Sequence, residues 1–130
     1  PRCICTSKGV RPLATLDDIK AALAAIDDEV HYGTAFGHDP AKPWDYTVFS
    51  RENTEPKENL TGYTDRYMVA VVREDYVPEG MYRKVIDAMS AIPGMRFDRT
   101  QRIEYVYDTK PGGAGVVEMM VLHFGKGVKA

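Results

Sequence analysis

The chain has 130 residues, of which 44% are hydrophobic and 28% charged, which predicts a single globular domain (1–130) with a modest core. The formal net charge of −2 argues against a nucleic-acid-binding protein, and no apolar run approaches the roughly 20 residues that would span a bilayer. Two cysteines imply no disulfide framework, and the opening "PRCICTSKGV" lacks the apolar stretch of a signal peptide, so we expect a soluble intracellular protein.

Charge is unevenly distributed along the chain. Residues 1–12 and 126–130 contain basic residues and no acidic ones, whereas "LDDIKAALAAIDDE" contains five acidic residues and one lysine. One interpretation is an ordinary solvated surface. The other is a charge-matched contact between neighbouring subunits.

The first predicted helix covers residues 15–27. Thr15 is a suitable N-cap, Asp18 places a carboxylate in the first turn, and apolar residues then recur three and four apart, at Leu16, Ile19, Leu23 and Ile26. A short strand is expected near Val30–Thr34, and "GHDPAKP" has the composition of a loop.

The segment from Trp44 to Ser50 is predicted to be a strand, with Tyr46 and Val48 on the same face as Trp44 and with Thr47 and Phe49 on the other. The twelve residues Arg51–Gly62 include one clearly apolar side chain and are predicted to form an extended polar loop (51–62). A second strand, Tyr63–Glu74, ends in a continuous apolar run that indicates burial on both faces.

A second amphipathic helix is expected in "VPEGMYRKVIDAMSAIPG", where Pro78 suits the first helical position and Pro93-Gly94 ends the helix. Its apolar stripe is Met81, Val85, Met89 and Ile92. The segments "QRIEYVYD", "TKPGGAG" and "VVEMMVLHF" then indicate a closing hairpin. This order predicts an α+β fold: an antiparallel β-sheet with two amphipathic helices packed on one face, plus a long inter-strand loop or hairpin extension.

The residues indicate no catalytic, cofactor or metal site. Cys3 and Cys5 would point the same way in a strand, but zinc needs about four ligands, and His31, His38 and His123 share no tight spacing with the cysteines. "GGAGVVE" lacks the features of a phosphate loop. Glu118, within an apolar strand, has two interpretations: a catalytic carboxylate, or a solvent-facing or inter-subunit position.

Pro1 has a functional alternative, because tautomerases use a terminal proline amine as a general base. The alternative is that Pro1 has no function and is simply the residue left at the terminus when an initiator methionine is removed.

Three stretches carry a family resemblance: "DEVHYGTAF", "WDYTVFSRENTEPKENLTGYTDRYMVAVVREDYVPEG" and "VIDAMSAIPGMR…VVEMMVLHFGKGVKA". In their order and length they resemble the tail completion, or tail terminator, proteins encoded in the head-to-tail module of long-tailed phages and prophages. The resemblance runs from about Asp17 to the C-terminus. The N-terminal arm (1–13) departs from the family, and its role stays open.

The resemblance implies a structural virion protein of the tail or neck, assembled in the host cytoplasm, with neither enzymatic activity nor a cofactor. Family members form a ring, usually of six copies, at the head-proximal end of the tail tube. The implied partners are further copies of the chain, the major tail tube protein and the head connector or stopper protein, and genome DNA passes through the lumen without specific binding.

We expect the extended polar loop at 51–62 to be mobile in the free monomer and to dock on a neighbouring chain. The predicted subunit-interface residues are Arg51, Glu52, Glu55, Lys57, Glu58, Asp65 and Arg66. Three alternatives stay open: another head-tail connector such as a head-closure protein, a Pro1-dependent tautomerase-like enzyme, and a phage-encoded inhibitor of a host protein.

Overall fold

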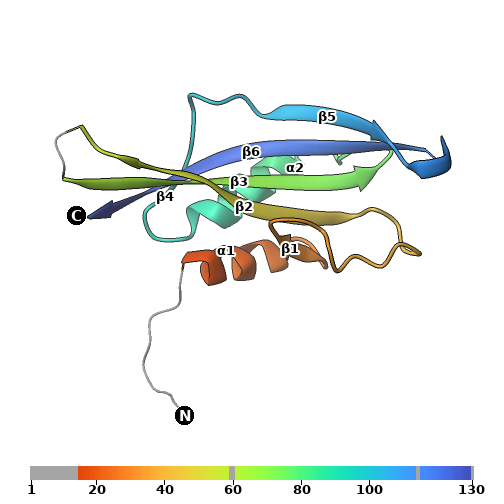
Figure 1. Ribbon diagram of the computed structural model, residues 1–130, viewed down its shortest axis with the longest axis horizontal. Helices are drawn as coiled ribbons and strands as arrows, with labels where there is room; N and C mark the ends of the chain where they lie inside the picture. The colour runs from red at the N-terminus through yellow and green to blue at the C-terminus, as the bar shows by residue number, and fades with distance from the viewer. Residues whose placement is uncertain (1–14, 59–60, 114, 130) are drawn as a thin grey trace, which may run out of the picture.

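The computed structural model describes residues 15–58, 61–113 and 115–129 (Figure 1), so the hypotheses about Pro1, Cys3 and Cys5 lie outside the described residues. The elements in chain order are α1 (Thr15–Ala24), β1 (Val30–Tyr32), β2 (Tyr46–Pro56), β3 (Gly62–Glu74), α2 (Met81–Ser90), β4 (Met95–Phe97), β5 (Glu104–Thr109), the 3₁₀ turn η1 (Pro111–Gly113) and β6 (Val116–Lys129). No helix in these ranges is long and apolar enough to cross a membrane.

The strands form one open six-stranded sheet in the order β1-β2-β3-β6-β4. Two strands pair with the edge of β6 that faces away from β3: β5 pairs with residues 116–121 and β4 with residues 124–126. The predicted α+β class is therefore confirmed. The sheet is mixed rather than purely antiparallel, since β1 runs parallel to β2 after the intervening loop carries the chain back to its starting edge.

Both helices pack on the same face of the sheet, as predicted (Figure 1). The core joins Ile19 and Leu23 of α1 and the α2 stripe to inward-facing residues of the three long strands. Those strand residues are Phe49, Tyr67, Val69, Val71, Met120, Leu122 and Phe124. The apolar stripes predicted from helical spacing are therefore the faces that the helices bury.

The prediction of an extended polar loop at 51–62 is wrong, and the hairpin alternative is right. Strand β2 continues to Pro56, and β3 begins at Gly62. The backbone N–H of Lys57 donates to the carbonyl oxygen of Gly62 at 3.0 Å and closes the turn. We call Arg51–Pro56 together with Gly62–Arg66 the polar hairpin. Composition misled the prediction because this ladder is held by backbone hydrogen bonds and its side chains are largely exposed.

Glu118 is buried, with 8% of its surface exposed, so the solvent-facing interpretation is wrong. Its Oε1 accepts the backbone N–H of Val77 at 2.6 Å, in the segment that leads into α2. The carboxylate thus fixes the path of the chain between β3 and α2. A buried polar group of this kind persists because it is hydrogen-bonded.

Burial of the central strand generates a stability prediction. Val71 is fully buried beneath the helices, so Val71→Ala should lower the free energy of unfolding by about 1–3 kcal/mol through lost burial and a cavity. The matched control is Val128→Ala, because Val128 is 39% exposed near the end of β6 and its truncation should cost less than about 0.5 kcal/mol. Urea denaturation compares the two, and equal losses would mean that β3 is misplaced.

Candidate subunit interface

The face of the sheet opposite the helices is lined with apolar side chains. Strand alternation directs eight of them to this side, and we call this set the open face: Val48, Met68, Ala70, Val72, Val106, Val117, Met119 and Val121. With Trp44 and Tyr46 at its border, most of the set lines a hollow of about 330 Å³. The sequence correctly placed Tyr46 and Val48 on the face opposite Thr47 and Phe49.

Strand β5 continues this surface to an unpaired edge of the sheet. It pairs with β6 on one side, and its other side has no partner strand within the described ranges. All six residues are exposed, including Tyr105, Val106 and Tyr107 at 45%, 47% and 63%. The segment "EYVYDT" contains strong β-formers and no lysine, proline or bulge, and its only charged side chains are Glu104 and Asp108. The β5 edge is therefore available to another strand.

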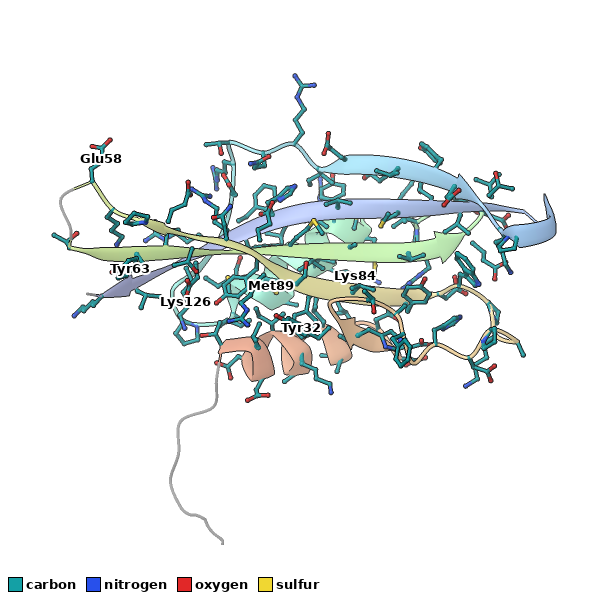
Figure 2. The ribbon with its side chains drawn as sticks, in the orientation of Figure 1. Tyr32, Glu58, Tyr63, Lys84, Met89 and Lys126 are labelled. Carbon is teal, nitrogen blue, oxygen red and sulfur yellow. The ribbon has the colours of Figure 1, made fainter. Side chains whose placement is uncertain are left out.

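The polar hairpin at the other side of the sheet is better protected. The outer edge of β2 is charged, and a register irregularity lies between Arg51 and Asn53. Both features discourage edge-to-edge pairing. The hairpin reaches the end of the molecule remote from the β5–β6 turn, with Glu58 and Tyr63 near its tip (Figure 2).

Most of the predicted interface residues contact their own subunit. Arg51 donates to the Tyr32 hydroxyl at 3.1 Å, and Asp65 accepts from Thr54 at 2.6 Å. Glu52 faces His123 Nδ1 at 3.0 Å. The structure thus accounts for these polar groups without a second chain, although they remain at the surface.

Arg66 links the polar hairpin to the segment after β4. It forms ion pairs with Glu55 and with Asp98, the latter at 2.8 Å. The hydrogen bond to Glu55 raises the pKa of the Arg66 guanidinium. Hydrogen bonds from Thr100, together with the nearby Arg66 charge, lower the pKa of the Asp98 carboxyl. Both groups are therefore charged at neutral pH.

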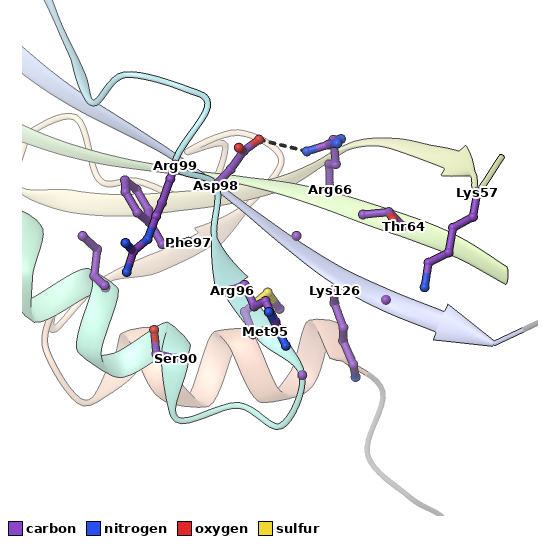
Figure 3. A pocket seen from close by; sticks show the side chains of 14 residues that line it. Lys57, Thr64, Arg66, Ser90, Met95, Arg96, Phe97, Asp98, Arg99 and Lys126 are labelled. Atoms are coloured by element: carbon purple, nitrogen blue, oxygen red, sulfur yellow. Dashed lines mark hydrogen bonds and ion pairs between the residues drawn. The ribbon is translucent and has the colours of Figure 1, made fainter. Parts of the chain in front are cut away.

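This ion pair lies in a groove of about 1090 Å³ between the polar hairpin and β4. Figure 3 shows Asp98 facing Arg66, with Lys57 and Lys126 farther along. One carboxylate, that of Asp98, stands among five cationic side chains that line this basic groove: Lys57, Arg66, Arg96, Arg99 and Lys126. The exposed carboxylate of Asp17 lies in the first turn of α1, so the molecule presents both signs of charge for contact between copies.

Sequence reasoning missed the open face and the β5 edge as candidate contact surfaces. A partial signal was present, because Val106 interrupts the polar phase of "EYVYD", where it stands between Glu104 and Asp108. A strand with one solvated face normally has polar residues at one phase. The structure also brings together Glu29, His31 and His38, which their sequence spacing did not connect.

No protein-family model matches the chain, and no curated protein matches it.

The polar hairpin should be ordered in the free monomer. Residues Tyr63–Arg66 are paired on one side with β2 and on the other with β6, so their amides should exchange slowly with solvent. The loop 34–43 provides the internal comparison, because it contains no strand. Hydrogen exchange of dilute monomer measures both segments, and equally fast exchange would restore the mobile-loop prediction.

Proposed function

We propose that this protein is a structural subunit of a phage tail, which assembles into a ring at the head-proximal end of the tail tube. The ring ends tube polymerisation and joins the tail to the head connector. The observation that carries this proposal is the apolar open face, which continues into the unpaired β5 edge. The order and length of the sequence blocks that resemble tail terminators support it.

A face of the sheet that neither helix covers can mark a contact with a partner. Helices cover one side of this sheet, and on the other side valine and methionine side chains line a hollow. Ala70 and Val72 are buried at its centre, whereas Val106 on β5 is 47% exposed. Contiguous apolar patches on a folded protein commonly mark protein–protein contacts. The adjoining β5 edge adds unpaired backbone groups that a second chain can satisfy by strand addition. Tyr105 and Tyr107 supply the aromatic side chains that are enriched at such interfaces.

The distribution of these surfaces favours a head-to-tail contact between copies. The β5 edge belongs to one side of the sheet, whereas the polar hairpin extends from the opposite end of the molecule (Figure 1). A contact between two different patches repeats from copy to copy, and it forms a ring when the rotation closes. The proposed occupant of the β5 edge is therefore a second copy of this chain, and six copies is the number that the resemblance implies.

The remaining surfaces have consistent roles in such a ring. The polar hairpin extends a subunit toward its neighbour or toward the tail tube beneath, and the ion pair of Arg66 with Glu55 joins its two strands. The chain's small negative charge suits a lumen through which DNA passes without being bound.

A single charge tests the assembly surface. Val106→Lys places an ammonium group on the open face beside the β5 edge, and we expect self-association to weaken by at least about tenfold. Tyr76→Lys is the matched control, because Tyr76 is 70% exposed in the segment before α2 and belongs neither to the open face nor to β5. Native mass spectrometry and analytical ultracentrifugation measure the oligomers, and thermal melting verifies that both monomers fold. Equal self-association of the two variants would show that the open face is not part of the interface between copies.

Tube capping tests the role in the tail. The wild-type protein should bind one end of tubes assembled from the major tail tube protein and stop their elongation, and electron microscopy should show a ring at that end. Tubes that elongate equally with and without the protein would contradict the proposed function.

A further inference from the structure

Glu29, His31 and His38 converge from two segments of the chain. Glu29 immediately precedes β1 and His31 lies within it, so these two side chains, two residues apart, share one side of the strand. His38 lies in the loop that follows β1. The backbone holds the strand in place, because the Thr47 N–H donates to the carbonyl oxygen of Glu29 at 3.0 Å and the Gly33 N–H donates to that of Phe49 at 2.8 Å.

The three side chains meet at one carboxylate oxygen. Glu29 Oε2 is 2.5 Å from His31 Nε2 and 2.7 Å from His38 Nδ1, and the three ligand atoms all lie within 4.8 Å of one another. The exposed fractions of the side chains are 29% for Glu29, 17% for His31 and 8% for His38. The cluster is thus enclosed by protein on the histidine side and reached by solvent on the carboxylate side.

Tyr46 holds both imidazole rings in position. Its ring centroid is 5.7 Å from that of His31, edge to face, and 4.7 Å from that of His38. Hydrogen bonding to His31, and then to His38, lowers the pKa of the Glu29 carboxyl, so this carboxylate is ionised at neutral pH. The site therefore presents one anionic oxygen and two imidazoles in a limited range of orientations.

We propose that Glu29, His31 and His38 bind one divalent transition-metal ion of the Zn²⁺ class. Two imidazoles and one carboxylate are a donor set suited to zinc, cobalt or nickel, whereas magnesium and calcium favour oxygen ligands alone. Around zinc, with bonds of about 2.0–2.2 Å, neighbouring tetrahedral ligand atoms are about 3.4 Å apart. To reach that spacing the Glu29 oxygen withdraws by about 1 Å, and the two histidine nitrogens, which lie within 4.8 Å of each other, adjust toward it. The solvent side leaves a position for water.

The surroundings of His38 indicate how tightly the site should bind zinc. Its Nε2 is buried and has no hydrogen-bond partner within the described residues. Coordination through Nδ1 moves the ring proton to Nε2, where it lacks the acceptor that a metal-bound histidine normally has. Loss of such a partner weakens metal binding by about 10–100-fold, so the site should bind zinc more weakly than a fully supported one.

Metal binding would attach the loop after β1 to the sheet. The loop between Gly33 and Asp45 contains His38 and also Trp44, the single tryptophan of the chain. A change at the metal site is therefore readable in tryptophan emission. The inference concerns the free chain and does not depend on ring assembly.

Titration of the metal-free full chain with ZnCl₂ and CoCl₂ tests the proposal, in a Cys3→Ser/Cys5→Ser background that removes competing thiols. We expect one ion per chain, a shift in Trp44 emission, a visible cobalt absorption band and no competition from Mg²⁺. His31→Gln and His38→Gln should each weaken zinc binding by at least tenfold. His123→Gln is the matched control, because His123 pairs with Glu52 without a second histidine and should bind zinc as the parent does.

Two results would overturn the proposal: no zinc binding at millimolar concentration, or equal binding by the His38→Gln and His123→Gln variants. X-ray absorption of the cobalt-loaded parent protein provides a measurement that needs no histidine variant. Two imidazole ligands in its coordination shell support the site, and a shell without histidine contradicts it.

Discussion

The pairing of β3 with β6 is the interaction on which the rest of this structure depends. Strand β3 is paired with β6 along its full length, from Gly62 opposite Lys129 to Glu74 opposite Val117. This register places Val69 opposite Leu122 and Val71 opposite Met120 beneath the helices. The same register sends Met68, Ala70 and Val72 to the opposite face. Because strand side chains alternate strictly, a shift of one residue would exchange the core and the open face.

The long ladder also explains how a polar segment can be ordered. Beyond the helices, β3 still has β2 on one side and β6 on the other, so its backbone groups are paired where few apolar side chains are buried. The two outer strands of the sheet, β2 at the polar hairpin and β5 beside β6, differ in how well they resist pairing with another chain. Charges of both signs and a register irregularity protect β2, whereas β5 has a regular register and presents two tyrosines and a valine between Glu104 and Asp108. This asymmetry is the physical basis for assigning the assembly surface to β5 and the extension to the polar hairpin.

Periodicity in the sequence predicted what local side-chain spacing determines. Both helices, the burial of Val69, Val71 and Val85, and the alternation around Thr47 and Phe49 follow from spacings of three to four or of two. Local patterns could not predict the parallel pairing of β1 or the three-residue β4, since those depend on long-range register. The polar hairpin was missed because strand propensity scales reflect burial, and this ladder has little.

Contacts between residues distant in the sequence show the same limit. The hydrogen bond between Glu118 and Val77 joins residues 41 apart, and His38 reaches Glu29 through a loop, so neither contact leaves a short motif. The open face also requires knowledge of where the helices pack. Its apolar residues are indistinguishable from core residues in the sequence, because Val72 and Val71 are adjacent and lie on opposite faces.

Site-specific photocross-linking at position 106 tests the central claim, that the open face and the β5 edge contact a second copy of this chain. A photoreactive residue replaces Val106 in the full chain, assembled particles are irradiated, and mass spectrometry identifies the linked peptides. The account predicts covalent dimers joined between position 106 and a peptide of another copy, distinguished by isotope labelling of one pool. Cross-links confined to the same chain, or to a different protein alone, would contradict it.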